Sequence, residues 1–385
     1  MKKLFLSMAA VLAVAAAFTI GYGEKVLAAD DTIKIGVFEP LTGENGGGGS
    51  QEVDGIKYAN QVYPEVLGKK VELVIVDNKS DKAEAVVAAT RLVEKEKVVA
   101  VIGSYGSGVS IAAGDIFRNA KVPAMGASCT NPMVTEGNEF YFRACFLDPF
   151  QGTVLANYAI AQGKKKAAVI TQLGDDYSTG LGSFFTREFK KLGGEIVADQ
   201  QFQTNEQDFN SILTNAKSAG ADVIFAPSSI VSAGLIIKQA KALGISALIM
   251  GGDTWENESI IQVAGDAAEG VVLSTFFDEN NSAATAEAKK FVPGFKGFLG
   301  GKDPIIPAVA ALGYDAYFVI LDAIKRAGST DGEAIRKALT ETKGLEGVTG
   351  SFQFDENGDA QKDFAVIKVI KGGKFEYLSS QSVGK

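Results

Sequence analysis

Histidine is absent from this chain of 385 residues, and its absence excludes several classes of enzyme. Without an imidazole, a Ser-His-Asp triad, a Cys-His pair and any zinc site with a histidine ligand are impossible. Only two cysteines are present, too few for a zinc site of four thiolates. A hydrolase could still use a serine–lysine or carboxylate mechanism, but no such pair of residues stands out in the sequence. We therefore expect a protein that is not an enzyme, with no metal and no cofactor.

The two cysteines, Cys129 and Cys145, leave two interpretations open. They could form one disulfide if the chain folds in an oxidising compartment. They could equally be two buried thiols, because the sequence does not determine their separation. Neither stands near the N-terminus, where a lipoprotein carries its modified cysteine.

Basic residues are fewer than acidic ones, with 38 lysines and arginines against 46 aspartates and glutamates and a net charge of −8. This excess argues against nucleic acid or an anionic membrane surface as a partner. The chain also lacks Pro- or Ser-rich linkers and low-complexity segments. Its length provides two or three domains' worth of residues. We therefore expect domains joined by short strand crossings, which favours a hinge over a flexible tether.

The first 29 residues have the features of a secretory signal peptide. Lys2 and Lys3 provide the positive start, residues 4–20 carry no charge, and residues 26–29 provide a small-residue cleavage pattern. The alternative is a membrane anchor, because the apolar stretch is nearly long enough to span a bilayer. We expect cleavage, since the flanks fit and no second apolar span follows, and a mature chain that is soluble and not a lipoprotein.

Beyond the signal, apolar runs typical of buried strands alternate with helical patterns. Ala85, Ala88, Ala89 and Leu92 stand at helical spacing and predict an amphipathic helix over residues 81–95. Alternation of strand and helix implies parallel sheets with helices on both faces, so we expect an α/β fold. The predicted strands are 33–38, 71–77, 98–102, 122–126 and 140–143, then 167–171, 195–202, 223–226, 248–251 and 271–273, and finally 364–370 and 375–377.

Two loops rich in small hydroxylated residues follow apolar runs of the first half, at residues 104–108 and 128–132. Ligands in open α/β sheets bind outside the carboxyl ends of the strands. A helix N-terminus there offers free N–H groups and a positive dipole end to an anion such as a carboxylate. Ser107 and Thr130 suit such a site, although each also fits an ordinary helix N-cap. With no strong base nearby, the loops indicate a small molecule that is held rather than transformed.

Asp253 follows a predicted strand of the second half. A carboxylate at the end of a buried strand can pair with a desolvated ammonium group through a charge-assisted hydrogen bond. The alternative is a cap for a helix over residues 257–264. Together with helix N-termini from the first half, this acid would form a clamp for a zwitterion.

Three other motifs favour ordinary structural roles. The glycines at 46–49 could cradle a phosphate, but no Gly-Lys-Ser/Thr follows, so we interpret them as a mobile loop of the cleft. Residues 355–359 resemble the start of a calcium loop without its final acid, which predicts a hairpin turn. Residues 175–177 could be a paired-carboxylate site, but a surface loop is the better interpretation.

These motifs, taken in order, resemble the periplasmic branched-chain amino-acid binding proteins, the substrate-binding components of ABC importers. Each match is modest alone, but their order and spacing together are specific. The matching stretches span essentially the whole mature chain and are Ile33–Val37, Pro40–Gly43, Ser104–Ser110, Thr130–Pro132, Phe142–Arg143, Asp148–Gly152, Asp176–Tyr177, Gly265–Val271 and Phe352–Asp359.

The resemblance implies two Rossmann-like lobes of periplasmic binding protein type I, joined by three crossings that form a three-strand hinge. We place the signal peptide at residues 1–29. Lobe 1 takes residues 30–147 and 275–348, and lobe 2 takes residues 148–274 and 349–385. One ligand is expected in the cleft between the lobes.

For lobe 1, the resemblance assigns roles by position. Ser107 matches the serine that binds the ligand carboxylate, and Ser128 matches the residue whose backbone carbonyl accepts from the ligand ammonium. Thr130 matches the threonine that contacts both ends of the amino acid. Tyr105 falls beside the ligand side chain.

For lobe 2, Tyr177 matches a cleft tyrosine, and Asp253 falls where the family has an acid, usually glutamate, for the ammonium. The family often has an aromatic residue where this chain has the glycines at 46–49, and a second tyrosine is replaced near Ser228 and Ser229. These departures alter the side-chain pocket and keep the α-amino-acid clamp. Leucine, isoleucine or valine is the leading expectation for the ligand.

The resemblance thus predicts a periplasmic protein that captures a free amino acid and delivers it to the membrane subunits of an ABC permease. We expect a monomer. The alternative is a ligand-sensing domain for an amino acid or amide that acts with a separate signalling partner.

Overall fold

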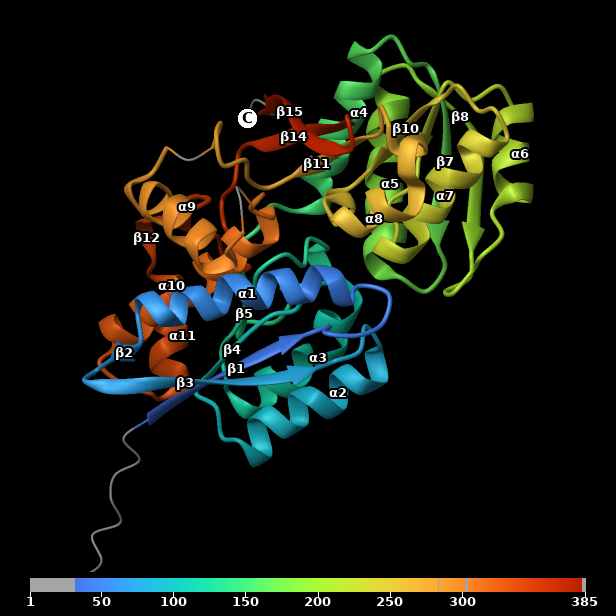
Figure 1. Ribbon diagram of the computed structural model, residues 1–385. Helices are drawn as coiled ribbons and strands as arrows, with labels where there is room; N and C mark the ends of the chain where they lie inside the picture. Colours follow the sequence, from blue (N-terminus) through green and yellow to red (C-terminus); the bar gives the residue numbers. More distant parts are fainter. Residues whose placement is uncertain (1–31, 283, 302–303, 383–385) are drawn as a thin grey trace, which may run out of the picture. The chain divides into compact units, whose positions relative to one another are not determined.

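The computed structural model describes residues 32–282, 284–301 and 304–382, so the predicted signal peptide lies outside the described residues. From Ile33 onward, the described residues form one compact unit. In the part of the chain that is described, no helix is both long and apolar enough to cross a membrane. The secondary structure is mixed α/β, with two large sheets and helices packed on them (Figure 1).

The first sheet has six strands in the order β2-β3-β1-β4-β5-β6. Its centre is parallel, because β1 pairs with β4, β4 with β5 and β5 with β6 in parallel register. The strands are β1 (Thr32–Glu39), β2 (Glu65–Val66), β3 (Lys69–Asp77), β4 (Ala100–Ile102), β5 (Ala124–Gly126) and β6 (Tyr141–Arg143). The helices of this segment are α1 (Gly46–Val62), α2 (Lys82–Thr90) with the π-turn η1 (Arg91–Lys95), and α3 (Ser107–Ala120).

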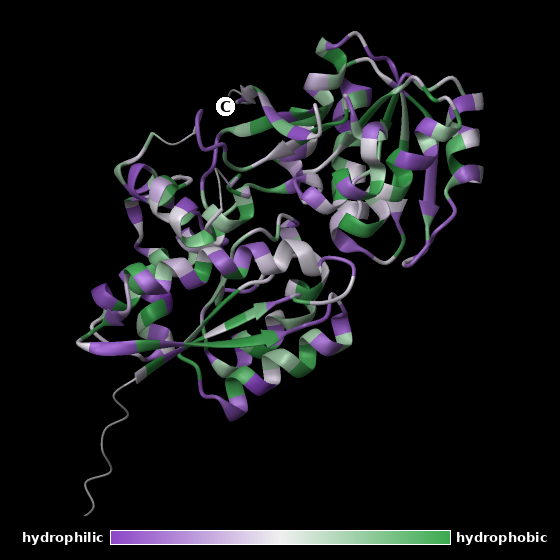
Figure 2. Ribbon diagram, viewed as in Figure 1, coloured by the Kyte–Doolittle hydropathy of each residue, from purple (hydrophilic) through white to green (hydrophobic). Residues whose placement is uncertain are grey.

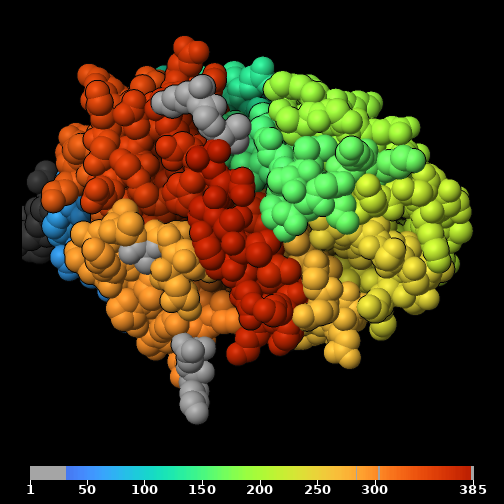
Figure 3. Space-filling model, turned by 90° about the horizontal axis from the view of Figure 1, so that it is seen from above, coloured from blue at the N-terminus to red at the C-terminus, as the bar shows by residue number. Residues whose placement is uncertain are grey.

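The second sheet has seven strands in the order β15-β14-β11-β10-β9-β7-β8. Five of them are parallel, and β14 and β15 add an antiparallel edge. The strands are β7 (Lys166–Gln172), β8 (Glu195–Phe202), β9 (Val223–Phe225), β10 (Leu248–Gly251), β11 (Val272–Thr275), β14 (Ala365–Lys371) and β15 (Lys374–Gln381). The helices are α4 (Asp148–Ala161), α5 (Asp176–Lys191), α6 (Asn210–Ser218), α7 (Ile230–Ala242) and α8 (Glu258–Ala264). Figure 3 shows the C-terminal segment exposed in red, beside the green segment that includes α4.

A third group of helices, α9 (Ala286–Leu299), α10 (Ala308–Ala327) and α11 (Gly332–Thr340), follows β11. The helix α10 packs along α1 and so belongs with the first sheet. The short hairpin β12 (Lys343–Gly347) and β13 (Gly350–Gln353) comes next, and the chain then returns to the second sheet with β14. The backbone therefore passes between the two sheets three times, in agreement with the expected two-lobed fold.

The apolar runs that predicted the strands correspond to residues that are buried in the structure. The central strands β4, β5 and β9 are buried at every residue, as expected for parallel strands with helices on both faces. Figure 2 shows most strands of the two sheets as hydrophobic and the helices as mixtures of hydrophobic and polar residues. The parallel α/β architecture predicted from the sequence is confirmed.

The prediction of a mobile loop at residues 46–49 is wrong, because these glycines form the first turn of α1. The N–H groups of Gly48 and Gly49 donate to the carbonyl of Asn45 at 3.0 and 3.2 Å. A Cβ on Gly48 would lie 2.4 Å from the ring of Tyr105. Glycine at this position is what lets the ring lie against the helix backbone.

Two predicted helix caps are also reassigned. The short helix η2 (Pro132–Val134) is capped by the side chain of Asn131, which accepts from the N–H of Met133, and not by Thr130. The helix α8 is capped by Asn257 and not by Asp253. Helix capping, the alternative to ligand binding for Thr130 and Asp253, is therefore excluded for both residues at these helices. The two cysteines are free, buried thiols.

Candidate functional site

A cavity of about 260 Å³ lies where the loops after the parallel strands of the two sheets meet. From the first sheet it is lined by the loop after β4 and by Ser128 after β5. From the second sheet it is lined by the segments after β7, β9 and β10. The sequence reasoning placed the ligand at the carboxyl ends of such strands.

Five of the six residues predicted to bind ligand line this cavity, namely Tyr105, Ser107, Ser128, Tyr177 and Asp253. They come from four separate stretches of the chain. The sixth, Thr130, is fully buried and does not line the cavity. Its hydroxyl has no hydrogen-bond partner among the described residues, and neither has the carboxyl group of Asp148, whose pKa burial raises well above its usual range.

Ser107 is the first residue of α3, and the residue before it, Gly106, has a backbone φ of +99°. The Ser107 hydroxyl accepts a 3.1 Å hydrogen bond from the N–H of Asn131, which ties the two predicted loops together. The first N–H groups of a helix have no partner within the helix, and α3 has no acidic residue in its first turn. This helix end therefore offers donors and a positive dipole to an anionic group in the cavity.

Asp253 begins the short helix η3 (Asp253–Trp255) on the opposite side and is only 3% exposed. Its Oδ1 accepts from Nε2 of Gln151 at 2.7 Å and from the hydroxyl of Tyr177 at 2.9 Å. Burial raises the pKa of Asp253 to about 6, and the bonds from Gln151 and Tyr177 limit that rise. At neutral pH the cavity thus contains a buried carboxylate held in one orientation.

Tyr105 forms an aromatic wall of the cavity. Its ring packs on Gly48, and its hydroxyl donates to the carbonyl of Thr254 across the cavity at 3.4 Å. Its N–H donates to Oε2 of Glu39 at 2.6 Å. The residue therefore joins the loop after β4 to both the first sheet and the opposite wall.

Further polar contacts connect the two walls around the cavity. The ammonium of Lys82 lies 2.7 Å from the Asp176 carboxylate. Glu44 accepts from Nε2 of Gln172 at 2.7 Å and from the N–H of Asn205 at 3.1 Å. These bonds join the two walls, so the structure describes a state in which the walls are in contact.

The lining is acidic. Glu44, Asp81, Asp175 and Asp253 contribute carboxyl groups, and Lys82 contributes one ammonium. Burial raises the pKa of Asp175 to about 6, even though the N–H groups at the start of α5 hold the carboxylate. A positively charged group of a ligand is favoured on the side of Asp253, and an anionic group is favoured at the start of α3.

Sequence reasoning missed four residues that support the site. Gln151, which positions Asp253, stands inside a matching stretch, so a signal was present. Glu39 and Glu52 are fully buried behind the cavity. Nothing in the sequence indicated that they are neighbours, because one belongs to a strand and the other to a helix. Arg143 was part of a matching stretch without an assigned role.

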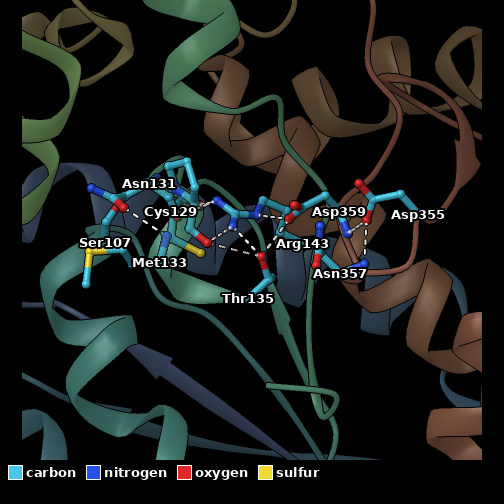
Figure 4. A network of polar contacts seen from close by, with 10 residues as sticks. Ser107, Cys129, Asn131, Met133, Thr135, Arg143, Asp355, Asn357 and Asp359 are labelled. Atoms are coloured by element: carbon cyan, nitrogen blue, oxygen red, sulfur yellow. Dashed lines mark hydrogen bonds and ion pairs between the residues drawn. The ribbon is translucent and has the colours of Figure 1, made fainter. Parts of the chain in front are cut away.

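Arg143 holds the loop after β5 in place (Figure 4). Its guanidinium donates to the carbonyls of Cys129 and Asn131 at 2.9 and 2.7 Å. Its Nε pairs with Oδ1 of Asp359 at 2.5 Å, and Thr135 accepts from Nη2 at 2.6 Å. The segment returning to the second sheet is thus connected to the loop that carries Ser128 and Thr130.

A two-lobed α/β architecture with a cavity at the strand ends between the lobes is typical of solute-binding proteins. The chain belongs to the periplasmic binding protein family, whose sequence profile matches residues 32–374. It is 31% identical over 362 residues to Leu/Ile/Val-binding protein homolog 3 of Brucella melitensis, covering 92% of this chain and 95% of that protein.

Solved structures agree. A leucine-binding protein from Thermotoga maritima is 40% identical, with a TM-score of 0.87 and coverage of 91% of this chain and 99% of that chain. A branched-chain amino acid transporter substrate-binding protein from Streptococcus pneumoniae, solved in complex with isoleucine, is 32% identical, with a TM-score of 0.84 and the same coverage. The predicted resemblance and fold class are confirmed.

Proposed function

We propose that this protein captures a free amino acid in the cavity and delivers it to the membrane subunits of an ABC importer. The observation that carries the proposal is the opposition of two groups across one cavity. The start of α3 at Ser107 provides donors for a carboxylate, and Asp253 provides a buried carboxylate for an ammonium. A free α-amino acid is the small molecule that presents both charges.

In this arrangement the ligand carboxylate lies against the N–H and hydroxyl of Ser107, and the ammonium lies between Asp253 and the carbonyl of Ser128. Tyr177 contacts the ligand from the second wall and orients Asp253. Thr130 acts through the loop that carries Ser128. A ligand that bridges both walls favours the closed state by its differential affinity for the closed and open states.

The side chain of the ligand faces Tyr105 and the segment near Ser228 and Ser229. Leucine, isoleucine or valine is the leading candidate, since relatives are named for these ligands. The cavity nevertheless has one aliphatic lining residue, Val109, and several hydroxyl and amide groups. Binding of polar amino acids therefore belongs in the same test.

The remaining predictions from the sequence are part of the same proposal. Residues 1–29 act as a cleaved signal peptide, so the mature protein is periplasmic and not lipid-anchored. Lobe 1 takes residues 30–147 and 275–348, and lobe 2 takes residues 148–274 and 349–385. The protein works as a monomer, binds no nucleic acid and performs no covalent chemistry.

The experiment is a thermal-shift screen of the mature chain with all common amino acids, followed by calorimetry on those that bind. A ligand that binds only the folded state at 100 times its Kd stabilises it by about 2.7 kcal/mol. Amines and carboxylic acids that match the best amino acid but lack one of its two charges serve as controls, and we expect neither to bind. A response to sugars alone, or equal binding of the single-charge analogues, would refute the proposal.

A further inference from the structure

Two buried glutamates lie directly behind the first wall of the cavity. Glu39 ends β1 and Glu52 lies in α1, and both are fully buried. One oxygen of each is committed to a cavity residue. Oε2 of Glu39 accepts from the N–H of Tyr105 at 2.6 Å, and Oε2 of Glu52 accepts from the hydroxyl of Ser128 at 2.5 Å.

The second oxygen of each glutamate, Oε1, is buried and has no hydrogen-bond partner. The two carboxyl groups lie close enough for each to shift the pKa of the other. Two carboxyl groups this close can hydrogen-bond each other only if at least one of them carries a proton, because two carboxylates offer acceptors and no donor. Within the described residues, neither Glu39 nor Glu52 takes part in an ion pair.

The titratable side chains that interact with the pair are all acids. They are Tyr105 in the loop after β4, Cys129 in the loop after β5, Tyr141 in β6, Cys145 in the segment after β6, and Asp253 in η3. The helix α10 faces Glu52 through Gly313, which has no charge. The guanidinium of Arg143 is committed to Asp359 and to backbone carbonyls. Nothing cationic on these elements neutralises the pair.

The charge of the pair is therefore sensitive to what enters the cavity. Burial raises the pKa of Glu39 well above its usual range, and the neighbouring Glu52 raises it further. Burial raises the pKa of Glu52 to about 7, and the negative charge of Asp253 on the opposite wall adds to this rise. A cation placed next to Asp253 offsets that repulsion and therefore favours ionised Glu52.

We propose that Glu39 and Glu52 form a proton-binding site coupled to ligand capture, which loses one proton to solvent when the ligand ammonium binds between Asp253 and Ser128. The ligand-free pair carries two protons in mildly acidic solution. The bound pair keeps one proton, shared between the two carboxyl groups, and Glu52 then carries the charge that faces the ammonium. This inference rests on the proposed function for the position of the ammonium.

The sign of the pH dependence follows from the released proton. Because binding releases a proton, ligand affinity rises with pH and levels off above the pKa of Glu52 in the ligand-free protein. Below that value, affinity falls by up to about tenfold per pH unit for one linked proton. The protein would thus hold its ligand more tightly in neutral than in acidic surroundings.

The first experiment is calorimetry of the mature chain with the tightest-binding amino acid of the screen, in buffers of different ionisation enthalpy. At about pH 6.5 we expect release of a large fraction of one proton, and near pH 8.5 almost none. Asp253 contributes part of the release at pH 6.5, so the same titration is run on the E39Q/E52Q double variant. Its two amides can still hydrogen-bond each other, and we expect its release to fall to the part due to Asp253.

Glu287→Gln is the matched control, because Glu287 is a buried glutamate that accepts from two tyrosine hydroxyls and does not line the cavity. We expect this variant to release as many protons as the unmodified chain. Equal proton release from the double variant and the unmodified chain would overturn the proposal.

A second measurement needs neither a ligand nor a variant. Carbon NMR of the ligand-free chain with labelled glutamate carboxyls should show one glutamate that titrates near pH 7 and one that stays protonated above it. If every glutamate carboxyl titrates below pH 6, the proton site does not exist. If no amino acid binds in the screen, the proposed function fails, and this titration still decides whether the pair holds its protons.

Discussion

The hydroxyl of Tyr177 donates a 2.9 Å hydrogen bond to Oδ1 of Asp253 inside the cavity. The two residues stand 76 positions apart and come from the start of α5 and from η3. Gln151 donates to the same oxygen at 2.7 Å. Two donors on one oxygen hold the carboxylate still, which is the condition for using it as a fixed partner of a ligand ammonium.

Asp253→Asn should weaken amino-acid binding strongly. The amide has the same shape and can still accept from Tyr177, so the change removes the negative charge alone. Leaving a buried charge without its partner costs about 3–5 kcal/mol, so we expect the Kd to rise by at least about a hundredfold in calorimetry. The exposed Asp266→Asn should leave the Kd unchanged. Unaltered affinity in the Asp253 variant would show that the ammonium is bound elsewhere.

Tyr177→Phe should weaken binding less and change its pH dependence. It removes one hydrogen bond to a charged group, which contributes about 1.5–3 kcal/mol. Because that bond helps to hold down the pKa of Asp253, the pKa should rise above its present value of about 6. Asp253 must be ionised to bind the ammonium, so affinity is lost as the pH falls through this pKa. Titrations between pH 5 and 8 should show that loss beginning at a higher pH in the variant, and an identical profile would contradict the assignment.

Arg143→Lys should destabilise the fold although it keeps the positive charge. Lysine cannot reproduce the planar set of donors that reaches Asp359 and the carbonyls of Cys129 and Asn131 together. We expect a loss of about 3–5 kcal/mol in the free energy of unfolding, measured with urea. Arg118→Lys, in an exposed pair with Asp115, should cost less than about 1 kcal/mol. A similar small effect at Arg143 would mean that the network in Figure 4 contributes little to stability.

The ligand-free protein should become less stable between about pH 4 and pH 7. Burial raises the pKa of Asp175, Asp253 and Asp315 to about 6 and that of Glu52 to about 7. The folded state therefore binds more protons than the unfolded state in this range, and its stability falls as the pH rises through the raised pKa values. A difference of one pKa unit corresponds to about 1.4 kcal/mol.

Urea unfolding at several pH values, with and without saturating amino acid, measures this slope. We expect the slope to be weaker with ligand, because an ammonium beside Asp253 lowers the pKa of Asp253 and of Glu52. Stability that rises steadily with pH over the same range would contradict the raised pKa values.

The sequence alone determined the class of fold and where to look for the site. Alternating apolar runs specify parallel strands, since a strand covered on both faces must be apolar along its whole length. The loop serines and Asp253 follow such strands, and topology brings the carboxyl ends of parallel strands to one edge. Five of the six predicted residues therefore line one cavity without any knowledge of side-chain packing.

Only the tertiary structure decided what those residues do to one another. The glycines at 46–49 were predicted to be a loop, because nothing local indicates that the ring of Tyr105 packs on Gly48 and leaves no room for a side chain. The capping roles of Thr130 and Asp253 were taken by Asn131 and Asn257. Contacts over long sequence separations, such as that of the Tyr177 hydroxyl with Asp253, depend on how distant segments of the chain pack. Burial and hydrogen-bond partners set the charge of a carboxyl group, and both become known only when the chain is folded.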